Sequence, residues 1–300
     1  MINKMSRRGF VLGGLAALLA FTPGISNAQE AKRIPDVIYG KKLGVALTLD
    51  VFQPAKPTGI GVLWMVSGGW VSNHNNIDPR VAKVFNEKGI TVFAVVHGSQ
   101  PKFVLKEIVQ DIHRATRFVR IHAKEYGVDP DRLGISGGSA GGHLSLTMGA
   151  FGNEGDTTSK DLVERASSKV QAVACFFPPT DFLNYGKEGQ SAMQIATLKS
   201  YWHVFGVTEQ TSDADRVRIA RDLSPIYGIT KDSPPTLLIH GDADTLVPLQ
   251  QSERMIQKLT SVGVPCKLIV AKGKGHGWLG IEKDVETLAD WFLTYLGKGK

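Results

Sequence analysis

The hydrophobic pattern of the chain changes period repeatedly along its length. Short continuous apolar runs rich in Val, Ile and Leu, bounded by Gly, Pro or Asp, are typical of strands buried on both faces. Six such runs occur, at 61–66, 90–96, 132–136, 170–177, 236–240 and 267–271. An earlier segment, 42–52, alternates apolar and polar residues as an antiparallel edge pair does.

Amphipathic helical patterns separate these runs. Between 104 and 126, apolar residues recur on one helical face, and Gly127 follows as a stop signal. Residues 249–259 and 285–296 are amphipathic as well. This alternation of strand and helix predicts an α/β fold, with a mostly parallel central sheet flanked by helices.

Residues 181–235 interrupt the alternation. The interval is polar and aromatic, without a clear strand, and has no hinge composition at its ends. We therefore expect a helical cap insertion over the end of the sheet, within a single domain that covers residues 29–300.

The first 28 residues have the features of a signal peptide. Three basic residues and no acid precede a short apolar run at 10–21, and a small-residue cleavage site ends at Ala28. About 12 apolar residues are too few to cross a bilayer, which needs about 20, so no stable membrane anchor is expected. The sequence SRRGF at 6–10 resembles a twin-arginine export signal. We expect the twin-arginine export machinery as a partner and a periplasmic or secreted location. The alternative is an ordinary secretory signal.

Charge excludes one class of partner. Removal of the basic leader lowers the formal net charge from +7 to +4, and the remaining Lys and Arg are scattered apart from a short tail at 297–300. A nucleic-acid surface needs a clustered basic patch, so no nucleic-acid partner is expected.

The segment GISGGSAGGH, residues 134–143, contains the pattern G-x-S-x-G twice. This motif needs a strand, a sharp turn at the serine and a helix that starts at once. With Ser136 at the turn, the strand would be too short and the helix would open on two glycines. With Ser139 at the turn, Gly137 and Gly141 stand where any Cβ would crowd it. We therefore expect Ser139 as the nucleophile and Ser136 as a strand residue near the pocket wall.

A serine hydroxyl needs a base to take its proton and an acid to orient that base. Of the eight histidines, His276 lies on a Gly-rich loop just past the last apolar strand and is the predicted base. His240 ends a strand among apolar neighbours, where a structural role is expected.

Two acids, Asp242 and Asp244, follow the strand at 236–240. One is expected to orient His276 while the other caps the turn. A metal pair is the alternative, but only His240 adds a possible third ligand, so no metal is predicted. The order of Ser139, Asp244 and His276 is nucleophile, acid, base.

Three motifs together carry a family resemblance. GGSAGG at the serine, HGDADTLVP at the acids and KGHGW at the histidine resemble the α/β-hydrolase superfamily over residues 38–296. The resemblance is to its small esterase and lipase-like branch, which includes acetylxylan and feruloyl esterases, and to the prolyl oligopeptidase catalytic domain. It implies an α/β-hydrolase fold that needs no cofactor, with Asp244 as the acid.

The family's oxyanion loop is H-G-G-G followed by an aromatic residue, whereas this chain has VSGGW at 66–70. The chemistry needs backbone N–H groups aimed at the developing oxyanion. We expect the hole to involve Gly68, Gly69, Trp70 and Ala140, with Gly69 or Trp70 as the donor from the loop. The alternative is that the two glycines form only a tight loop.

Two tryptophans follow these motifs. Trp70 and Trp278 are candidate substrate-binding residues, and ordinary core packing is the alternative for each.

The family's strand order also bears on the two cysteines, Cys175 and Cys266. It places them on strands with another strand between, about 9–10 Å apart, which exceeds the roughly 7 Å limit of a disulfide. Two free, buried thiols are expected.

The combined expectation is a serine carboxylic-ester hydrolase that acts through an acyl-enzyme on small acyl or carbohydrate-linked esters. A serine peptidase resembling prolyl oligopeptidase is one alternative, although the chain is too short for that family's additional domain. An inactive hydrolase fold used for binding is the other, motivated by the altered oxyanion loop.

Overall fold

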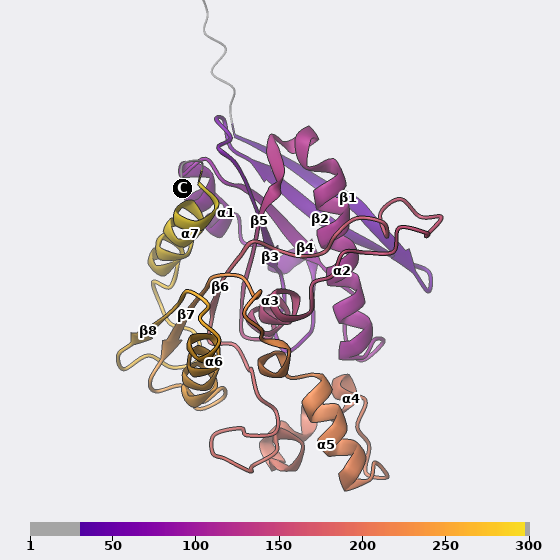
Figure 1. Cartoon of the computed structure of the whole chain (residues 1–300), viewed down its shortest axis with the longest axis vertical. Helices are drawn as coiled ribbons and strands as arrows, with labels where there is room; N and C mark the ends of the chain where they lie inside the picture. The colour runs from indigo at the N-terminus through magenta and orange to yellow at the C-terminus, as the bar shows by residue number, and fades with distance from the viewer. Residues whose placement is uncertain (1–30, 298–300) are drawn as a thin grey trace, which may run out of the picture.

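The computed structural model describes residues 31–297. An eight-stranded sheet forms its centre, in the order β1-β2-β4-β3-β5-β6-β7-β8 (Figure 1). The two strands β1 and β2 are antiparallel at one edge, and the other six run parallel to one another. All six parallel strands thus end at the same edge of the sheet.

The strands are β1 (Lys32–Lys42), β2 (Val45–Gln53), β3 (Gly59–Met65), β4 (Thr91–Val96), β5 (Val128–Gly138), β6 (Ala172–Phe176), β7 (Thr236–Gly241) and β8 (Cys266–Ala271). The α-helices are α1 (Pro79–Glu87), α2 (Leu105–His122), α3 (Ala140–Phe151), α4 (Trp202–Phe205), α5 (Asp213–Asp222), α6 (Gln250–Ser261) and α7 (Glu282–Leu296).

The six apolar runs correspond to β3 through β8, with shifted ends. β5 begins at Val128, four residues before the predicted start, because Val128 already pairs with Gly59 of β3, and a register shift separates this pair from the regular pairing that starts at Leu133. β6 is shorter than predicted. The segment 42–52 was expected to form an antiparallel pair, but it provides only β2. The strand that pairs with it in an antiparallel way is the preceding β1, which the sequence analysis did not predict as a separate strand.

Two helices differ from their predictions. α2 ends at His122 and continues as a 3₁₀ turn, η2 (Ala123–Tyr126), before Gly127 closes it in the left-handed conformation at φ 69°. α1 was not predicted, since its pattern is short. Its start signals were present in the sequence: Asp78 caps the helix and Pro79 stands at its first position.

Helices cover both faces of the sheet (Figure 1). The apolar faces of α2, α3 and α6 share one core with residues such as Leu63 and Ile135. α1 and α7 share a second core on the other face, with residues such as Val62 and Phe292. The continuous apolar runs reflect this arrangement, because strands such as β3, β4, β6 and β7 supply side chains to both cores.

The interval 181–235 contains only short helices, namely α4, α5 and the 3₁₀ turns η3 (Ala192–Gln194), η4 (Ala196–Tyr201) and η5 (Pro225–Gly228). Its start is fixed to α6, because the side-chain carbonyl of Gln251 accepts hydrogen bonds from the amides of Thr180 and Asp181, at 2.9 and 2.8 Å. Farther along, the Leu223 carbonyl lies 2.8 Å from Nε2 of His143 on α3. The segment is thus attached to the main domain at both ends.

The two cysteines are free, as expected, and lie on β6 and β8 with β7 between them. Cys175 is buried, and burial raises the pKa of its thiol. Cys266 is only half-buried, so the prediction of a second buried thiol is wrong. It lies on the last strand of the sheet, which has a neighbour on one side only.

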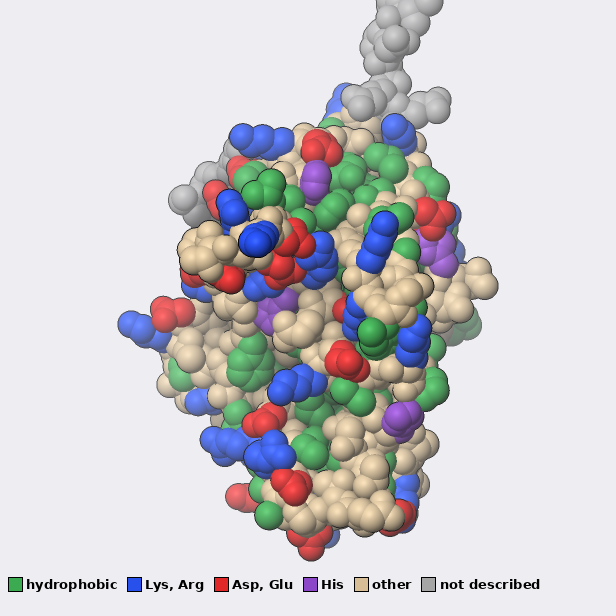
Figure 2. All heavy atoms as spheres, turned by 90° about the vertical axis from the view of Figure 1, so that its right-hand side faces the viewer, with side chains coloured by type: hydrophobic (Ala, Val, Ile, Leu, Met, Phe, Trp, Pro, Cys, Tyr) green, Lys and Arg blue, Asp and Glu red, His purple; other side chains and the backbone are tan. Residues whose placement is uncertain are grey.

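Acidic and basic side chains are interspersed on the face of the molecule shown in Figure 2, with no large area of one sign. Among residues 31–297, no helix combines the length and the apolar character that a bilayer crossing requires. The predicted signal peptide at 1–28 lies outside the described residues.

Candidate active site

Ser139 occupies a sharp turn between β5 and α3. Its backbone has φ 54° and ψ −119°, a conformation that costs a non-glycine residue free energy. A Cβ on Gly141 would lie 2.7 Å from the Met65 carbonyl oxygen, and one on Gly137 would lie 2.8 Å from the backbone of Gly141. Both glycines are therefore required by the close packing around this serine, as predicted.

Ser136 has a different environment. It lies fully buried within β5, where its hydroxyl donates to the Ala174 carbonyl at 2.6 Å. It lines neither of the two cavities beside Ser139, but its partner on β3, Trp64, lines the larger one, so Ser136 lies close to the pocket wall without forming it. Its hydrogen bond joins β5 to β6.

The loops after β5, β7 and β8 bring three predicted residues together. His276 Nε2 lies 2.8 Å from Ser139 Oγ, and His276 Nδ1 lies 2.7 Å from Asp244 Oδ2. These residues are far apart in the chain but meet because the three parallel strands end at one edge of the sheet. The arrangement has the geometry of a nucleophile, a base and an orienting acid.

Asp244 is held as a carboxylate. Its Oδ1 accepts hydrogen bonds from the amides of Leu246 and Val247, both at 2.9 Å. Burial alone raises the pKa of this carboxyl, but the hydrogen bonds from His240, His276 and Val247 together outweigh burial. The pKa of Asp244 therefore lies well below its ordinary value. A negative charge is thus available beside the imidazole of His276.

The neighbouring candidates have structural contacts. His240 is buried, with Nδ1 2.7 Å from the Ser252 hydroxyl and Nε2 2.8 Å from the Val247 carbonyl, as expected of a structural histidine. Asp242 is exposed and accepts from the Gly273 amide at 2.6 Å, so it caps the turn.

One group of possible metal ligands lies elsewhere in residues 31–297, and the sequence analysis did not identify it. The ligand atoms of Asp36, Asp50 and His74 lie within 4.8 Å of one another. Arg33 already pairs with Asp50 at 2.6 Å, which neutralises the buried carboxylate. The three side chains are thus explained as part of a group of ion pairs around Asp50.

The loop at 66–70 forms a tight two-residue turn. Gly68 and Val71 exchange both backbone hydrogen bonds, at 3.0 and 2.9 Å, and both residues between them have positive φ: 54° at Gly69 and 59° at Trp70. This is the pattern of a type I′ turn. The Gly68 amide is thus already used within the turn, which leaves the amides of Gly69 and Trp70, the two expected donors, as the candidates from this loop.

Three other amides remain available. Within residues 31–297, the N–H groups of Gly69 and Trp70 have no hydrogen-bond partner. The Ala140 N–H is likewise free, because it begins α3 and the first turn of a helix leaves its amides unpaired. The side-chain amide of Gln100 donates to the Gly69 carbonyl at 2.5 Å and holds the turn. Nothing in the local sequence around Gln100 indicates this role.

An aromatic cluster supports Trp70 in its unfavourable conformation. Its ring contacts those of Phe205, Tyr201 and His143, with centroids 5.2 to 5.6 Å apart. Its indole N–H lies 3.4 Å from His143 Nδ1, and His143 Nε2 lies 2.8 Å from the Leu223 carbonyl. Burial lowers the pKa of His143 to about 4, so the ring is neutral and can both accept and donate. The loop at 66–70, α3 and the insertion are thereby connected.

Two cavities adjoin Ser139. The smaller has a volume of about 30 Å³ and a mainly aromatic wall, and Trp70, Ala140 and Tyr201 line it. The larger is an open cleft of about 530 Å³, and Gly68 and His276 line it.

Trp278 lines neither cavity. It packs against Phe176 and Phe177, and its indole N–H donates to Asp284 at 2.8 Å. Of the two expectations for this residue, the structure favours core packing over substrate binding.

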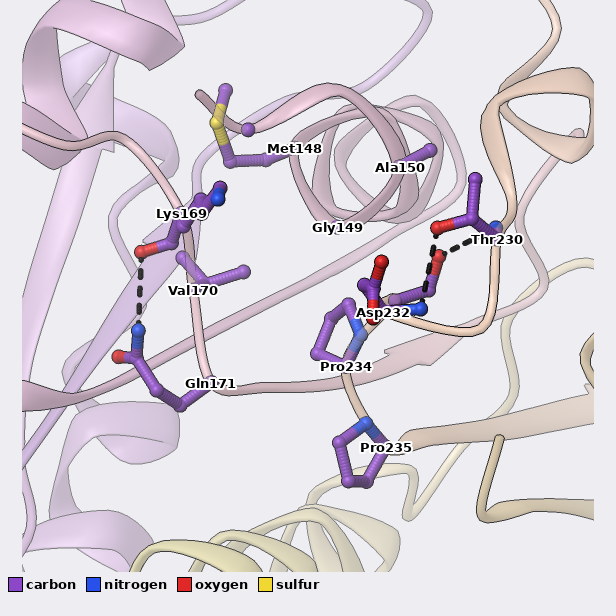
Figure 3. Close-up of a pocket in the computed structure, with 12 residues that line it drawn as sticks. Met148, Gly149, Ala150, Lys169, Val170, Gln171, Thr230, Asp232, Pro234 and Pro235 are labelled. Atoms are coloured by element: carbon purple, nitrogen blue, oxygen red, sulfur yellow. Dashed lines mark hydrogen bonds between the residues drawn. The ribbon is translucent and has the colours of Figure 1, made fainter. Parts of the chain in front are cut away.

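A third cavity, of about 540 Å³, lies at the opposite edge of the sheet (Figure 3). Lys169, Val170 and Gln171 precede β6 on one side, and the loop from Thr230 to Pro235 precedes β7 on the other. Since Ser139, Asp244 and His276 follow the carboxyl ends of strands, this cavity is separate from them.

Known proteins share this architecture. The family model described as BD-FAE matches residues 49–259. The chain is 31% identical over 235 residues to the probable carboxylic ester hydrolase LipM of Mycobacterium tuberculosis, an alignment that covers 76% of this chain and 52% of that protein. It is 26% identical to esterase LipC of the same organism, covering 86% of this chain and 63% of the relative. The chain thus spans about half to two-thirds of the length of these relatives.

Solved structures agree on the fold. A truncated form of carbohydrate esterase from gut microbiota superposes with a TM-score of 0.77 at 23% identity, covering 91% of this chain and 99% of that one. The apo form of Thermogutta terrifontis esterase 2 superposes with a TM-score of 0.68 at 25% identity, covering 92% and 97%. With its parallel sheet, its strained serine turn and a family match over most of its length, this chain belongs to the BD-FAE family and has the predicted α/β-hydrolase fold.

Proposed function

We propose that this protein is a serine carboxylic-ester hydrolase, acting on small acyl or carbohydrate-linked esters through an acyl-enzyme. The observation that carries the proposal is the continuous hydrogen-bonded chain from Ser139 through His276 to Asp244, at 2.8 and 2.7 Å. The relatives named as ester hydrolases and the esterase structures of the same fold support it.

In the first half of the reaction, Ser139 Oγ attacks the ester carbonyl carbon, and His276 Nε2 takes the hydroxyl proton. The carbonyl oxygen becomes an oxyanion, which accepts hydrogen bonds from the free amides of Ala140 and of Gly69 or Trp70. The bond to the alcohol oxygen then breaks, and His276 returns its proton to that oxygen. Alcohol leaves, and the acyl group remains on Ser139.

In the second half, water attacks the acyl-enzyme while His276 takes one of its protons. The bond to Ser139 Oγ breaks, the proton returns to that oxygen, and the carboxylic acid leaves. Asp244 stays ionised throughout and stabilises the imidazolium form of His276, in keeping with the lowered pKa of its carboxyl. The residues named supply every proton transfer in this cycle.

The two alternatives have less support. A binding protein with a hydrolase fold was motivated by the unusual VSGGW loop, yet that loop retains free amides at Gly69 and Trp70 beside Ser139. A peptidase would use the same three residues, and the relatives and structures compared above carry esterase names. We therefore rank ester hydrolysis first.

Fluorophosphonate labelling followed by peptide mass mapping tests the proposal. We expect one adduct, on Ser139, and no adduct in the Ser139→Ala variant, which should also lose at least about 10³-fold in hydrolysis of 4-nitrophenyl acetate. The Ser136→Ala variant is the matched control, because its hydroxyl lies inside the sheet, and it should still be labelled. A folded protein that gives no adduct and no hydrolysis would favour the binding alternative.

We also propose export to the periplasm or the medium through the twin-arginine route, on the strength of SRRGF at 6–10. Replacing both arginines by lysine should keep the protein in the cytoplasm while preserving the charge. Export of this variant at the normal level would indicate an ordinary secretory signal.

A further inference from the structure

Two cavities of very different size meet at Ser139. The smaller holds about 30 Å³ and the larger about 530 Å³. Both are lined by Gly69, Tyr201 and Leu246 in addition to the serine. Tyr201 comes from the insertion and Leu246 from the loop that carries Asp244, so these two side chains form the shared wall.

The position of His276 determines which half of an ester each cavity receives. To release the alcohol, His276 must donate its proton to the leaving oxygen, so the alcohol must lie on the histidine side of Ser139. His276 lines only the larger cavity, whereas Ala140, with its free amide, lines only the smaller one. The alcohol therefore occupies the larger cavity, and the acyl group extends into the smaller one.

The smaller cavity has little room. A cavity needs a volume of about 10–15 Å³ to hold one water molecule. A cavity of about 30 Å³ therefore admits a methyl group but not an extended acyl chain. The larger cavity falls within the range of about 300–1,000 Å³ that is usual for small-molecule sites. A short acyl group and a bulky alcohol match this asymmetry.

The shared wall is held in place by its own contacts. The Tyr185 hydroxyl donates to the Leu246 carbonyl at 2.8 Å, and the Leu246 amide donates to Asp244 at 2.9 Å. The Tyr201 ring lies edge-on to Trp70, with centroids 5.6 Å apart and an angle of 81°. A Cβ on Gly69 would lie 3.1 Å from the Tyr201 ring, so this ring sits directly over the oxyanion turn. The hydrogen bonds fix the backbone of Leu246, and a movement of the Tyr201 ring would break its contact with Trp70.

We propose that Tyr201, together with Leu246, sets the upper limit on the length of the acyl group that this protein removes. The inference rests on the proposed ester hydrolysis and adds two specificity-determining residues to it. The overall reaction consumes one ester and one water and releases the carboxylic acid and the alcohol. Tyr201 acts on specificity through its bulk, since its ring fills the space that a longer chain would need.

The test compares kcat/KM for 4-nitrophenyl acetate, propionate and butyrate. The unmodified protein should prefer acetate to butyrate by at least about tenfold, the usual scale of a methylene-sized misfit. Tyr201→Ala should raise the butyrate-to-acetate ratio by about tenfold or more, because it opens the wall. Leu246→Ala is a second variant for the same wall and should act in the same direction.

Two controls separate bulk from other effects. Tyr201→Phe keeps the ring and should preserve the preference for acetate. Val81→Ala enlarges only the larger cavity and should leave the acyl-length profile unchanged.

Equal rates on acetate and butyrate in the unmodified protein would overturn the inference while leaving ester hydrolysis intact. An unchanged ratio in both Tyr201→Ala and Leu246→Ala would do so as well, and so would a shift caused by Val81→Ala, which would reverse the assignment of the cavities. Failure of the folded protein to hydrolyse any of the three esters would contradict the proposed function itself, and with it this extension.

Discussion

The two ends of the parallel sheet carry cavities of nearly equal volume and very different chemistry. The cleft at the carboxyl ends holds about 530 Å³, and the cavity at the amino ends holds about 540 Å³ (Figure 3). Only the first is lined by Ser139 and His276, which are hydrogen-bonded to each other, and Asp244 lies behind the histidine. The second is lined by residues of α3 and by loops, with Lys169 and Asp232 as its charged residues. Volume alone therefore does not identify the site.

Backbone strain distinguishes the two ends more sharply. Among residues 31–297, five residues other than glycine have positive φ, and three of these, Trp70, Ser139 and Phe177, line the two cavities that meet at Ser139. None lines the amino-end cavity. Strained conformations persist only where the surrounding packing holds them, so their concentration at one end indicates where function was selected over stability.

The largest expected effect comes from the buried carboxylate. Asp244→Asn should lower kcat/KM for 4-nitrophenyl acetate by about 10⁴-fold, because a neutral amide cannot stabilise the imidazolium form of His276. Asp242→Asn is the matched control in the same turn, and we expect a change of less than about threefold because its carboxylate is exposed. Equal losses in the two variants would mean that the acid has been assigned wrongly.

The next effect tests the packing beneath the serine. Gly141→Ala places a Cβ 2.7 Å from the Met65 carbonyl oxygen, so the turn must shift. Overpacking of this kind costs about 1–3 kcal/mol, which lowers the midpoint of thermal unfolding by roughly 3–10 °C, and activity should fall as well. Gly138→Ala meets only ordinary contacts at 3.5 Å and serves as the control for the melting temperature. A Gly141→Ala protein with unchanged melting temperature and activity would contradict the strained-turn account.

Acid should destabilise the fold through buried neutral histidines. Burial lowers the pKa of His97, His113 and His143 to about 4. In the unfolded chain, each of these histidines binds a proton at its ordinary pKa of about 6.5. The stability that the neutral buried rings contribute is therefore fully present above pH 6.5, and it is lost as the pH falls from about 6.5 to about 4. The loss should reach the order of 3 kcal/mol for each histidine. Urea unfolding across this range measures it.

The control for the acid effect is His122→Gln, which changes a histidine paired with Glu125 at the surface. This variant should keep the same dependence of stability on pH. A flat stability profile between pH 6.5 and 4 in the unmodified protein would show that the three buried rings do not titrate as expected.

The smallest effect is expected at the other end of the sheet. Asp232→Ala and Lys169→Ala alter the charged residues of the amino-end cavity, and kcat/KM should stay within about twofold of the unmodified value. A tenfold loss in either variant would show that the two cavities are functionally connected, and the contrast between the ends would then need revision.

Much of this molecule follows from local patterns in its sequence. Continuous apolar runs predicted the parallel strands, since a strand buried on both faces has no polar side. The spacing of glycines around Ser139 predicted the turn, because the close contacts of Gly141 exclude any Cβ. The positions of Asp244 and His276 just after strands were enough to predict that they meet, since parallel strands end at one edge.

Other features depended on residues distant in the chain, which no local pattern encodes. The Gly68 amide donates its hydrogen bond within a turn that Gln100 holds. Gln100 lies 31 residues along the chain from Gly69, whose carbonyl it contacts. The place of Tyr201 above Gly69 depends on how the insertion packs, and the packing of the half-buried Trp278 depends on its contact with Phe176 of β6. Periodicity and motif spacing thus determined the fold class and the candidate residues Ser139 and His276, because both follow from local geometry, and the family resemblance selected Asp244 over Asp242. Only long-range packing decided the shape of the cavities and which amides remain free to donate.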